Sequence, residues 1–246
     1  MIKISTCTAS YEGMGKTNEY EHRLELLEQS LKALKKHGVK LAVFPGGYFY
    51  AGDNAQAKEI AHELHGLAKS HTLNIAVGID TKEKFSKGFK GELKKGELPF
   101  FACVCMHESK APELWAQRSI TRKIYSETAQ GCYQESRTID IEGIKIEVLM
   151  CGEIFNAQIR EVIISRKTNV IVDLAHISDK FRIYGTMKNL AKRGIRSFCS
   201  VHTQRKSAMK ACYLPCKQHG YMRKSDNRID VSIGASPRLE HAIWEI

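Results

Sequence analysis

The sequence predicts an α/β protein with a mixed sheet, and three observations support this fold class. Segments with the apolar, β-branched character of strands alternate along the chain with segments whose apolar residues recur at helical spacing. Such alternation is typical of helices that cover a sheet. Residues 99–119 and 211–234 resemble pairs of strands joined by turns, which indicates antiparallel pairing beside the parallel strands. No Pro- or Ser-rich linker divides the 246 residues, so we expect one domain spanning 1–246.

The first half of the chain contains clear strand and helix patterns. Residues 18–37 place leucines on one helical face and are followed by Gly38, a residue typical of helix ends. Residues 39–44 form an apolar run that stops at Pro45-Gly46-Gly47. We therefore predict helices at 18–37 and 55–70, and strands at 2–9, 39–44, 73–79, 99–107 and 113–119.

The second half is arranged around the stretch 143–160. Residues 144–150 have the composition of a buried strand, and 153–165 carry apolar residues at helical spacing. Cys151 therefore lies where a strand stops and a helix starts. We predict strands at 144–150, 169–174 and 197–202, helices at 153–165 and 182–193, and short strands near Ala211, Tyr221 and Ile229.

The position of Cys151 has chemical consequences. Gly152 allows the backbone to turn sharply after it, and the N-terminus of the following helix favours a thiolate over a thiol. The N–H groups of that helix can also bind an oxyanion formed when a thiolate attacks a carbonyl or nitrile carbon. The alternative is that Cys151 is a small buried apolar residue, as most free cysteines are. Glu153 likewise has a simple explanation as an acid in a first helical turn.

Composition narrows the class of protein. No run approaches the roughly 18 apolar residues of a membrane-spanning helix, and residues 1–5 lack the apolar core of a secretory signal. Eight unevenly spaced cysteines fit reduced thiols better than a disulfide framework, so we expect a cytoplasmic protein without membrane partners.

The formal net charge of +11 is concentrated in three groups of basic residues. Residues 82–96 form a lysine-rich, glycine-spaced segment that we interpret as an exposed hairpin or loop. No aromatic interleaving or nucleic-acid-binding motif accompanies these charges, so we favour a soluble basic surface over nucleic-acid binding. The other two groups are Arg118, Arg122 and Lys123, and Arg205, Lys206 and Lys210.

Three segments resemble the nitrilase, or carbon–nitrogen hydrolase, superfamily. Residues 41–45 (LAVFP) resemble the apolar strand that ends in Pro, after which that family places a catalytic Glu. Arg122-Lys123 ahead of Glu127 resembles the catalytic-lysine segment, and 148–153 (VLMCGE) resembles the nucleophile elbow. Residues 190–193 before an apolar strand extend the likeness, which covers the chain from Ile2 to about Ile233.

This resemblance implies a four-layer α-β-β-α sandwich with mixed sheets and a Glu-Lys-Cys site. Cys151 would attack a small amide, nitrile or carbamoyl carbon, and water would release the thioester-type intermediate. Lys123 and the N–H following Cys151 would stabilise the oxyanion. The resemblance implies a homodimer, paired through the helix and strand after the nucleophile. No cofactor or metal is expected.

One departure from the family's pattern concerns the general base. Gly46 occupies the position of the catalytic Glu, and glycine has no side chain to move a proton. Glu127, which resembles the family's second glutamate, is a candidate replacement, and Glu153 is a weaker one. Two function classes remain open: a hydrolase of non-peptide C–N bonds, or a catalytically impaired member that binds a small ligand or a protein partner.

Other residues are candidates for contact with substrate or for alternative chemistry. Cys151 could instead pair with His176 or His202 in a Cys-His scheme. Cys212, Cys216 and His219 have the residue types of a zinc site, but the sequence does not identify a fourth ligand and Pro215 fits an ordinary turn, so we favour the turn. Cys103 and Cys105 should share one buried strand face. As substrate-contacting residues we propose Gly152, Glu153, Tyr48, Arg122 and His176.

Overall fold

The computed structural model describes eight stretches of the chain, which together contain the helices and strands below. The described residues are 1–10, 19–81, 100–118, 135–177, 180–203, 213–214, 227–232 and 238–246. The α-helices are α1 (Glu19–Lys36), α2 (Asn54–His71), α3 (Ala157–Ser165) and α4 (Lys180–Lys192). A 3-10 helix spans Cys151–Phe155, just before α3. The strands are β1 (Lys3–Ser10), β2 (Val39–Val43), β3 (Phe49–Tyr50), β4 (Asn74–Asp80), β5 (Phe100–Cys105), β6 (Glu113–Ala116), β7 (Thr138–Ile141), β8 (Ile144–Met150), β9 (Val170–Ile177), β10 (Arg196–Thr203), β11 (Tyr213–Leu214), β12 (Arg228–Ser232) and β13 (Arg238–Glu245).

The described strands form one strongly curled mixed sheet. Its main path runs β6-β5-β4-β2-β1-β10-β9-β8-β7, and β13 pairs antiparallel with β1 along its whole length. Within this path the six consecutive strands β4, β2, β1, β10, β9 and β8 run parallel to one another, whereas β5 pairs antiparallel with β4 and β7 pairs antiparallel with β8. β1 and β10 pair only at their last residues, from Thr8↔Val201 to Ser10↔Thr203. This short junction divides the sheet into two halves that fold against each other.

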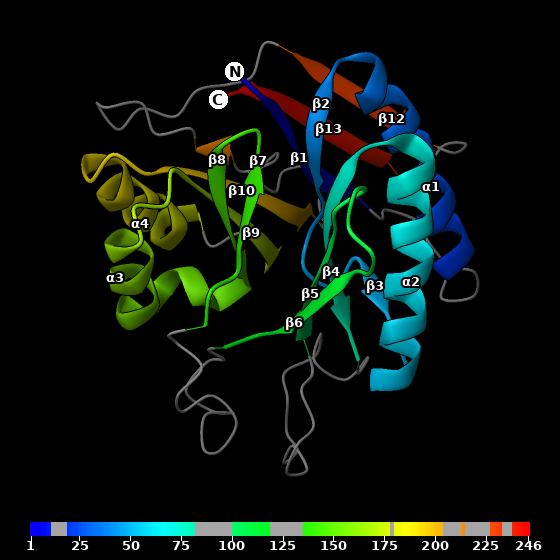
Figure 1. The fold of residues 1–246 in the computed structure, drawn as a ribbon, viewed down its shortest axis with the longest axis horizontal. Helices are drawn as coiled ribbons and strands as arrows, with labels where there is room; N and C mark the ends of the chain where they lie inside the picture. The colour runs from blue at the N-terminus through cyan, green and yellow to red at the C-terminus, as the bar shows by residue number, and fades with distance from the viewer. Residues whose placement is uncertain are drawn as a thin grey trace.

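The two halves and the four helices make four layers, as Figure 1 shows. Helices α1 and α2 cover the half that contains β1, β2, β4 and β5, and α3 and α4 cover the half that contains β8, β9 and β10. Between the halves lies a core that joins Ile4 and Val43 on one side to Val148 and Val172 on the other. The α-β-β-α sandwich expected from the resemblance is therefore present, with its two sheets continuous through the β1–β10 junction.

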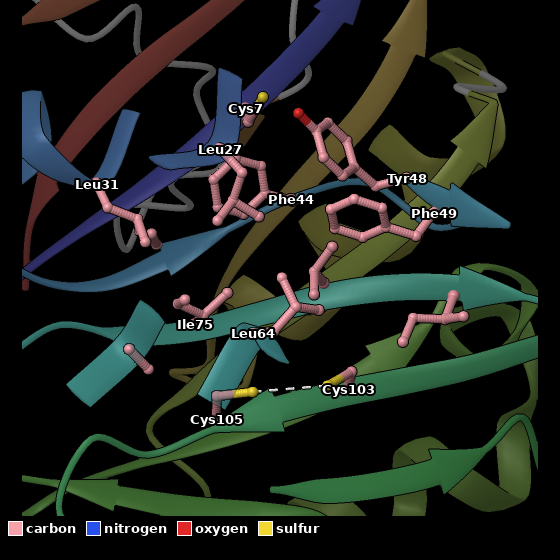
Figure 2. Close-up of a cluster of buried hydrophobic side chains, with 14 of the residues drawn as sticks. Cys7, Leu27, Leu31, Phe44, Tyr48, Phe49, Leu64, Ile75, Cys103 and Cys105 are labelled. Atoms are coloured by element: carbon pink, nitrogen blue, oxygen red, sulfur yellow. Dashed lines mark hydrogen bonds between the residues drawn. The ribbon is translucent and has the colours of Figure 1, made fainter. Parts of the chain in front are cut away.

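The core under α1 and α2 contains a cluster of rings and thiols (Figure 2). Phe44, Tyr48 and Phe49 pack at ring-centroid distances of 5.2 and 4.9 Å, and all three are fully buried. Cys103 and Cys105 share one face of β5, with their Sγ atoms 3.6 Å apart. Their placement in the core confirms the prediction made for these two thiols.

Three parts of the sequence-based assignment are wrong. The helix predicted at 153–165 begins only at Ala157, because a five-residue 3-10 helix and the Asn156 N-cap precede it. The strand pair predicted within 211–234 does not form among the described residues, since β11 pairs with β10 and β12 with β13. Strands β7 and β13 were not predicted. The short strand expected near Tyr221 lies outside the described residues.

Candidate active site

The candidate site lies where the carboxyl ends of parallel strands from both halves of the sheet meet. Asp80 is the last residue of β4, Cys151 follows β8, and His176 lies near the end of β9. The loop 44–48 follows β2 at the same edge, and its Gly46 N–H donates a hydrogen bond to the carbonyl of Ala175 on β9. The carboxyl ends of parallel strands are where α/β proteins commonly bind ligands.

The backbone at Cys151 is held in an unusual conformation. Its φ angle is +46°, in the left-handed region that side-chain-bearing residues rarely adopt. The sharp turn that sequence reasoning assigned to Gly152 is therefore made by the cysteine itself. Strain of this kind costs on the order of 1–3 kcal/mol and persists only where the surroundings enforce it.

The thiol of Cys151 interacts with the side chain and with the backbone of His176, and both interactions favour the thiolate. Burial alone would raise the thiol's pKa, but these two interactions and the charge of His176 outweigh burial and lower the pKa below its usual value. The nearby Asp80 carboxylate opposes the lowering. The α-helix that was expected to activate the thiol starts six residues later, at Ala157, so the imidazole takes the role assigned to the helix N-terminus.

His176 is itself held by Asp80. The His176 Nε2 atom lies 2.9 Å from both carboxylate oxygens of Asp80, whose side chain is only 4% exposed. Burial would lower the imidazole's pKa, but the charge and hydrogen bond of Asp80, together with Cys151, raise it well above its usual value. The ring of Phe100 packs edge-on against the imidazole at 4.9 Å. The three side chains form a continuous series from carboxylate to imidazole to thiol.

The glycine loop after β2 is fixed from several sides. The Gly78 N–H donates to the carbonyl of Pro45 at 3.0 Å, and Arg23 Nη1 donates to the carbonyl of Gly47 at 3.3 Å. His202 Nε2 lies 2.7 Å from the carbonyl oxygen of Gly46. These contacts hold the loop against β9 and β4.

His202, the other histidine considered for pairing with Cys151, has a different role. Burial, Arg23 and His176 lower the pKa of His202 to about 3, so its ring is neutral at physiological pH. A carbonyl oxygen only accepts, so the neutral ring donates its Nε2–H to Gly46. His202 thus supports the glycine loop.

A buried group of four charged residues fixes the end of β8. Arg118 Nη2 lies 3.2 Å from Glu153 Oε2 and 3.3 Å from Glu147 Oε1, and Arg137 Nη1 lies 3.2 Å from Glu153 Oε1. Glu153 also accepts from the Met150 N–H at 3.3 Å, and Gln117 Nε2 donates to the Met150 carbonyl at 3.0 Å. Sequence reasoning placed Arg118 in a basic surface group, but its side chain is fully buried. We call Arg118, Arg137, Glu147 and Glu153 the elbow clamp.

Asp173 is a second buried acid close to the elbow. Asp173 is fully buried, and among the described residues neither of its carboxyl oxygens has a hydrogen-bond partner. Only a weak interaction with the Cys151 backbone N–H and the charge of His176 oppose the effect of burial. Burial, with Cys151 and Glu153 adding to it, raises the carboxyl's pKa well above its usual range. The folded protein therefore favours the protonated, uncharged form of Asp173.

The residues predicted for the site fall into three groups. Cys151, His176 and the Gly46 position meet at the strand ends. Tyr48 and Glu153 do not face the thiol. The Tyr48 side chain lies in the core beside Phe44 and Phe49 (Figure 2), where its hydroxyl donates to the Arg23 carbonyl, and Glu153 belongs to the elbow clamp. Gly152 follows Cys151 in the 3-10 helix. The residues Arg122, Lys123 and Glu127, and the possible zinc ligands Cys212, Cys216 and His219, lie outside the described residues.

Sequence reasoning missed Asp80, Arg137 and Gln117. Asp80 ends a predicted strand, and a carboxylate at a strand end is the signal that could have singled it out. Pairing it with His176 required knowing that β4 and β9 belong to facing halves of the sheet. Within the described part of the chain, no group of three or more His, Cys, Asp or Glu side chains is arranged to hold a metal ion. No described helix is both long enough and apolar enough to span a bilayer.

Comparison with known proteins relates the chain to one fold. Neither a protein-family model nor a curated protein sequence matches it. Among solved structures, it has the fold of amidases of the nitrilase superfamily. A cysteine-to-alanine variant of the amidase from Nesterenkonia sp. AN1, in complex with butyramide, matches with a TM-score of 0.68 at 11% identity, over 99% of this chain and 90% of that chain.

Two further structures, both of a glutamate-to-glutamine variant of the same Nesterenkonia amidase, also match. One shows covalent addition of the acetamide moiety of fluoroacetamide at the active-site cysteine, and matches with a TM-score of 0.66 at 12% identity over 99% of this chain and 90% of that chain. The other shows Michael addition of acrylamide at that cysteine, with a TM-score of 0.65 at 14% identity over 98% and 92%. At these identities the likeness establishes the fold.

Proposed function

We propose that the protein hydrolyses the C–N bond of a small amide through a covalent thioester on Cys151. The observation that carries this proposal is the pairing of the strained, partly exposed Cys151 with an imidazole that lowers the thiol's pKa. A thiolate is the nucleophilic form of cysteine, and positive charge beside it is the usual means of obtaining one near neutral pH. The other described cysteines, Cys7, Cys103, Cys105 and Cys199, are buried.

The structural neighbours support a cysteine nucleophile. In a glutamate-to-glutamine variant of the Nesterenkonia amidase, the active-site cysteine takes up the acetamide moiety of fluoroacetamide and adds to acrylamide, and a cysteine-to-alanine variant binds butyramide. All three compounds are small amides, so we propose the same substrate class for this chain. Cys151 is the residue that we assign to the corresponding role.

The oxyanion formed in this reaction needs hydrogen-bond donors. We assign the backbone N–H of Gly152 and the ammonium of Lys123 to this task, and Glu127 to a supporting role beside them. Arg122 is our candidate for contact with an acidic group of the substrate. These assignments for 122–127 rest on the sequence resemblance described above.

Fluoroacetamide tests the nucleophile directly. We expect intact mass spectrometry to show one acetamide adduct, and peptide mapping to place it on Cys151. The variant Cys151→Ala should lose this adduct, and the buried Cys199 should stay unmodified in folded protein. Ammonia release from acetamide, propionamide and butyramide then tests turnover. An adduct that maps to other cysteines, or that forms equally in Cys151→Ala, would contradict the proposal.

A second candidate function is a binding protein that has lost catalysis, and the glycine at position 46 favours it. In that case butyramide would bind without ammonia release, and Cys151 would alkylate no faster than an ordinary thiol. Binding measured by calorimetry, with turnover absent in the ammonia assay, would support this function over hydrolysis. We further propose a cytoplasmic homodimer for either function.

A further inference from the structure

We propose that His176, positioned by Asp80, is the acid–base group of the reaction and replaces the carboxylate that the glycine loop lacks. This inference rests on the proposed function, because it assigns the proton transfers of the same thioester chemistry. Proton transfer is required twice: a proton must reach the leaving nitrogen, and another must leave the attacking water. In the Cys151–His176–Asp80 series, the His176 imidazole next to the thiol can carry out both proton transfers.

The glycines at 46 and 47 provide the space that this series occupies. A Cβ atom at Gly46 would lie 2.6 Å from the Leu174 carbonyl oxygen and 3.0 Å from His176 Nδ1. A Cβ atom at Gly47 would lie 2.6 Å from Asp80 Oδ2 and 3.1 Å from His176 Cδ2. Separations below about 3 Å are shorter than any ordinary carbon contact. In this backbone arrangement, any side chain at position 46 would clash with the Leu174 carbonyl and crowd the imidazole of His176.

A third glycine, Gly78 on β4, allows the loop 44–48 to pack closely beside the His176–Asp80 pair. A Cβ atom at Gly78 would lie 2.3 Å from the Cα atom of Gly46, so a third glycine allows the loop to lie directly on β4. The Gly47 φ angle of +61° also favours glycine. Glycine is thus required at three adjoining positions around the His176–Asp80 pair. The missing glutamate is explained by a replacement of the base rather than by its loss.

The orientation of the imidazole suits its role. Nε2 is engaged with both oxygens of Asp80, which leaves Nδ1 as the nitrogen available to the thiol side of the ring. A carboxylate that accepts from one ring nitrogen fixes the tautomer and stabilises the imidazolium form. Asp80 acts only through His176 and is a positioning residue, whereas His176 interacts with the reacting thiol itself.

The proton transfers balance over one turnover. The Cys151 thiolate forms a C–S bond with the amide carbon, and the C–N bond breaks as the His176 imidazolium gives its proton to the departing nitrogen. The products are ammonia, or an amine, and the thioester. Neutral His176 then takes a proton from water as the water oxygen bonds to the acyl carbon. The C–S bond breaks, the carboxylic acid leaves, and the thiolate–imidazolium pair is restored.

The charged and titratable groups around His176 are consistent with this cycle. Burial disfavours the protonated form of His176, but Asp80 from β4 and Cys151 from the elbow favour it. The neighbouring β10 residue His202 is neutral and so adds no positive charge beside the ring. Burial of Asp173 on β9 raises the pKa of its carboxyl, which favours the uncharged acid. These interactions favour an imidazolium beside a thiolate in the resting site, and loss of the thiolate on acylation removes one of the two groups that favour the protonated imidazole.

The test separates acylation from deacylation with p-nitrophenyl acetate. Its leaving group needs no proton, so a burst of p-nitrophenolate reports the Cys151 thiolate alone, and the later steady rate reports base-assisted release of the acetyl group. Acylation is run at about pH 9.5, where even an unpaired thiol with a pKa of roughly 8.5 is ionised. The acetylated protein is then moved to neutral pH, and acetyl loss is followed by intact mass.

We expect His176→Asn to keep the burst at high pH and to lose acetyl about 10²–10⁴-fold more slowly than the wild-type protein. Imidazole added to His176→Ala should restore part of the rate. His65→Asn is the matched control, because His65 is a buried, hydrogen-bonded histidine outside the site, bonded to Ser109 and the Met106 carbonyl. Its acetyl loss should equal that of wild type. Thermal melting of each variant confirms folding.

Three results would overturn the inference. If His176→Asn loses acetyl as fast as wild type, His176 is not the base. If Glu127→Gln loses deacylation while His176→Asn keeps it, the carboxylate of Glu127 is the base. In both cases the burst persists, so the proposed function survives. If the wild-type protein gives no burst that depends on Cys151, the proposed function fails, and the inference fails with it.

Discussion

At the scale of single residues, Asp80 controls when the imidazole gains and loses its proton. Its carboxylate raises the pKa of His176, and base-assisted deacylation requires the neutral ring. We expect Asp80→Asn to move the midpoint of the pH–rate profile for acetyl loss to lower pH, and to reduce the plateau rate because the ring is less well oriented. Stopped-flow measurement of deacylation between about pH 5 and pH 9 checks this, since the usual imidazole pKa is roughly 6.5. An unmoved midpoint would show that Asp80 does not act on His176.

Asp173 gives a second prediction at this scale, on stability. Because its pKa is raised in the folded state, the folded protein keeps a proton that the unfolded chain releases above the ordinary aspartate pKa of 3.8. This effect therefore lowers the unfolding free energy as the pH rises toward the folded pKa, and is absent at low pH. Asp173→Asn removes the ionisable group. Its unfolding free energy relative to wild type should increase from about pH 4 toward pH 7, by up to about 1.4 kcal/mol per pH unit. Urea titrations at several pH values measure the difference, and a constant difference would contradict a buried neutral acid.

At the scale of elements, the elbow clamp joins the ends of β6, β7 and β8 and so maintains the strained turn at Cys151. Arg118 is shared by Glu147 and Glu153, and its loss would leave two buried carboxylates without that partner. We expect Arg118→Gln to lower the unfolding free energy by about 3–5 kcal/mol, the usual cost of breaking a buried ion pair. Lys32→Gln, which removes an exposed ion pair with Glu28, is the control and should cost below about 1 kcal/mol. Comparable losses in the two variants would show that the clamp does not stabilise the elbow.

The elements also show how far sequence reasoning reaches. The apolar periods of 39–44, 55–70 and 144–150 were enough to locate β2, α2 and β8 within one or two residues. β13 was missed because its buried residues include Leu239, His241 and Ala242 on both faces, so it lacks the alternation of a half-buried strand.

The site itself depended on long-range contacts that no local pattern contains. Sequence reasoning placed Cys151 at a strand end and kept His176 as a possible partner, because both follow neighbouring strands. It could not select His176 over His202, since that choice depends on which ring touches the thiol. Asp80 lies 96 positions from His176, in the opposite half of the sheet. The interpretation of Gly46 depended on the same long-range contacts. The sequence alone indicated a missing general base, whereas the fold shows that the His176 side chain lies beside this glycine.

At the scale of the whole molecule, the two ends of the chain close the fold. β13 pairs with β1 over eight residues, Ile2 and Ile246 exchange backbone hydrogen bonds, and Trp244 Nε1 donates to Thr6 Oγ1 at 3.1 Å. Figure 1 shows the termini side by side. A chain ending at residue 237 would expose an edge of β1 in the middle of the sandwich. We expect this truncation to lose cooperative thermal unfolding, whereas Trp244→Phe should keep it with a lower midpoint. A truncated chain that melts cooperatively near the wild-type temperature would contradict the closing role of β13.

The most direct measurement of the thiolate–imidazolium pair is the pH dependence of iodoacetamide labelling at Cys151. The wild-type protein should label with a midpoint below the ordinary thiol pKa of roughly 8.5, because His176 stabilises the thiolate. In His176→Asn, burial acts without the imidazole, so the midpoint should rise to the ordinary value or above it. Cys151→Ala supplies the background from other cysteines. A wild-type midpoint at or above the ordinary value, or one that His176→Asn leaves unchanged, would contradict an activated cysteine at this site.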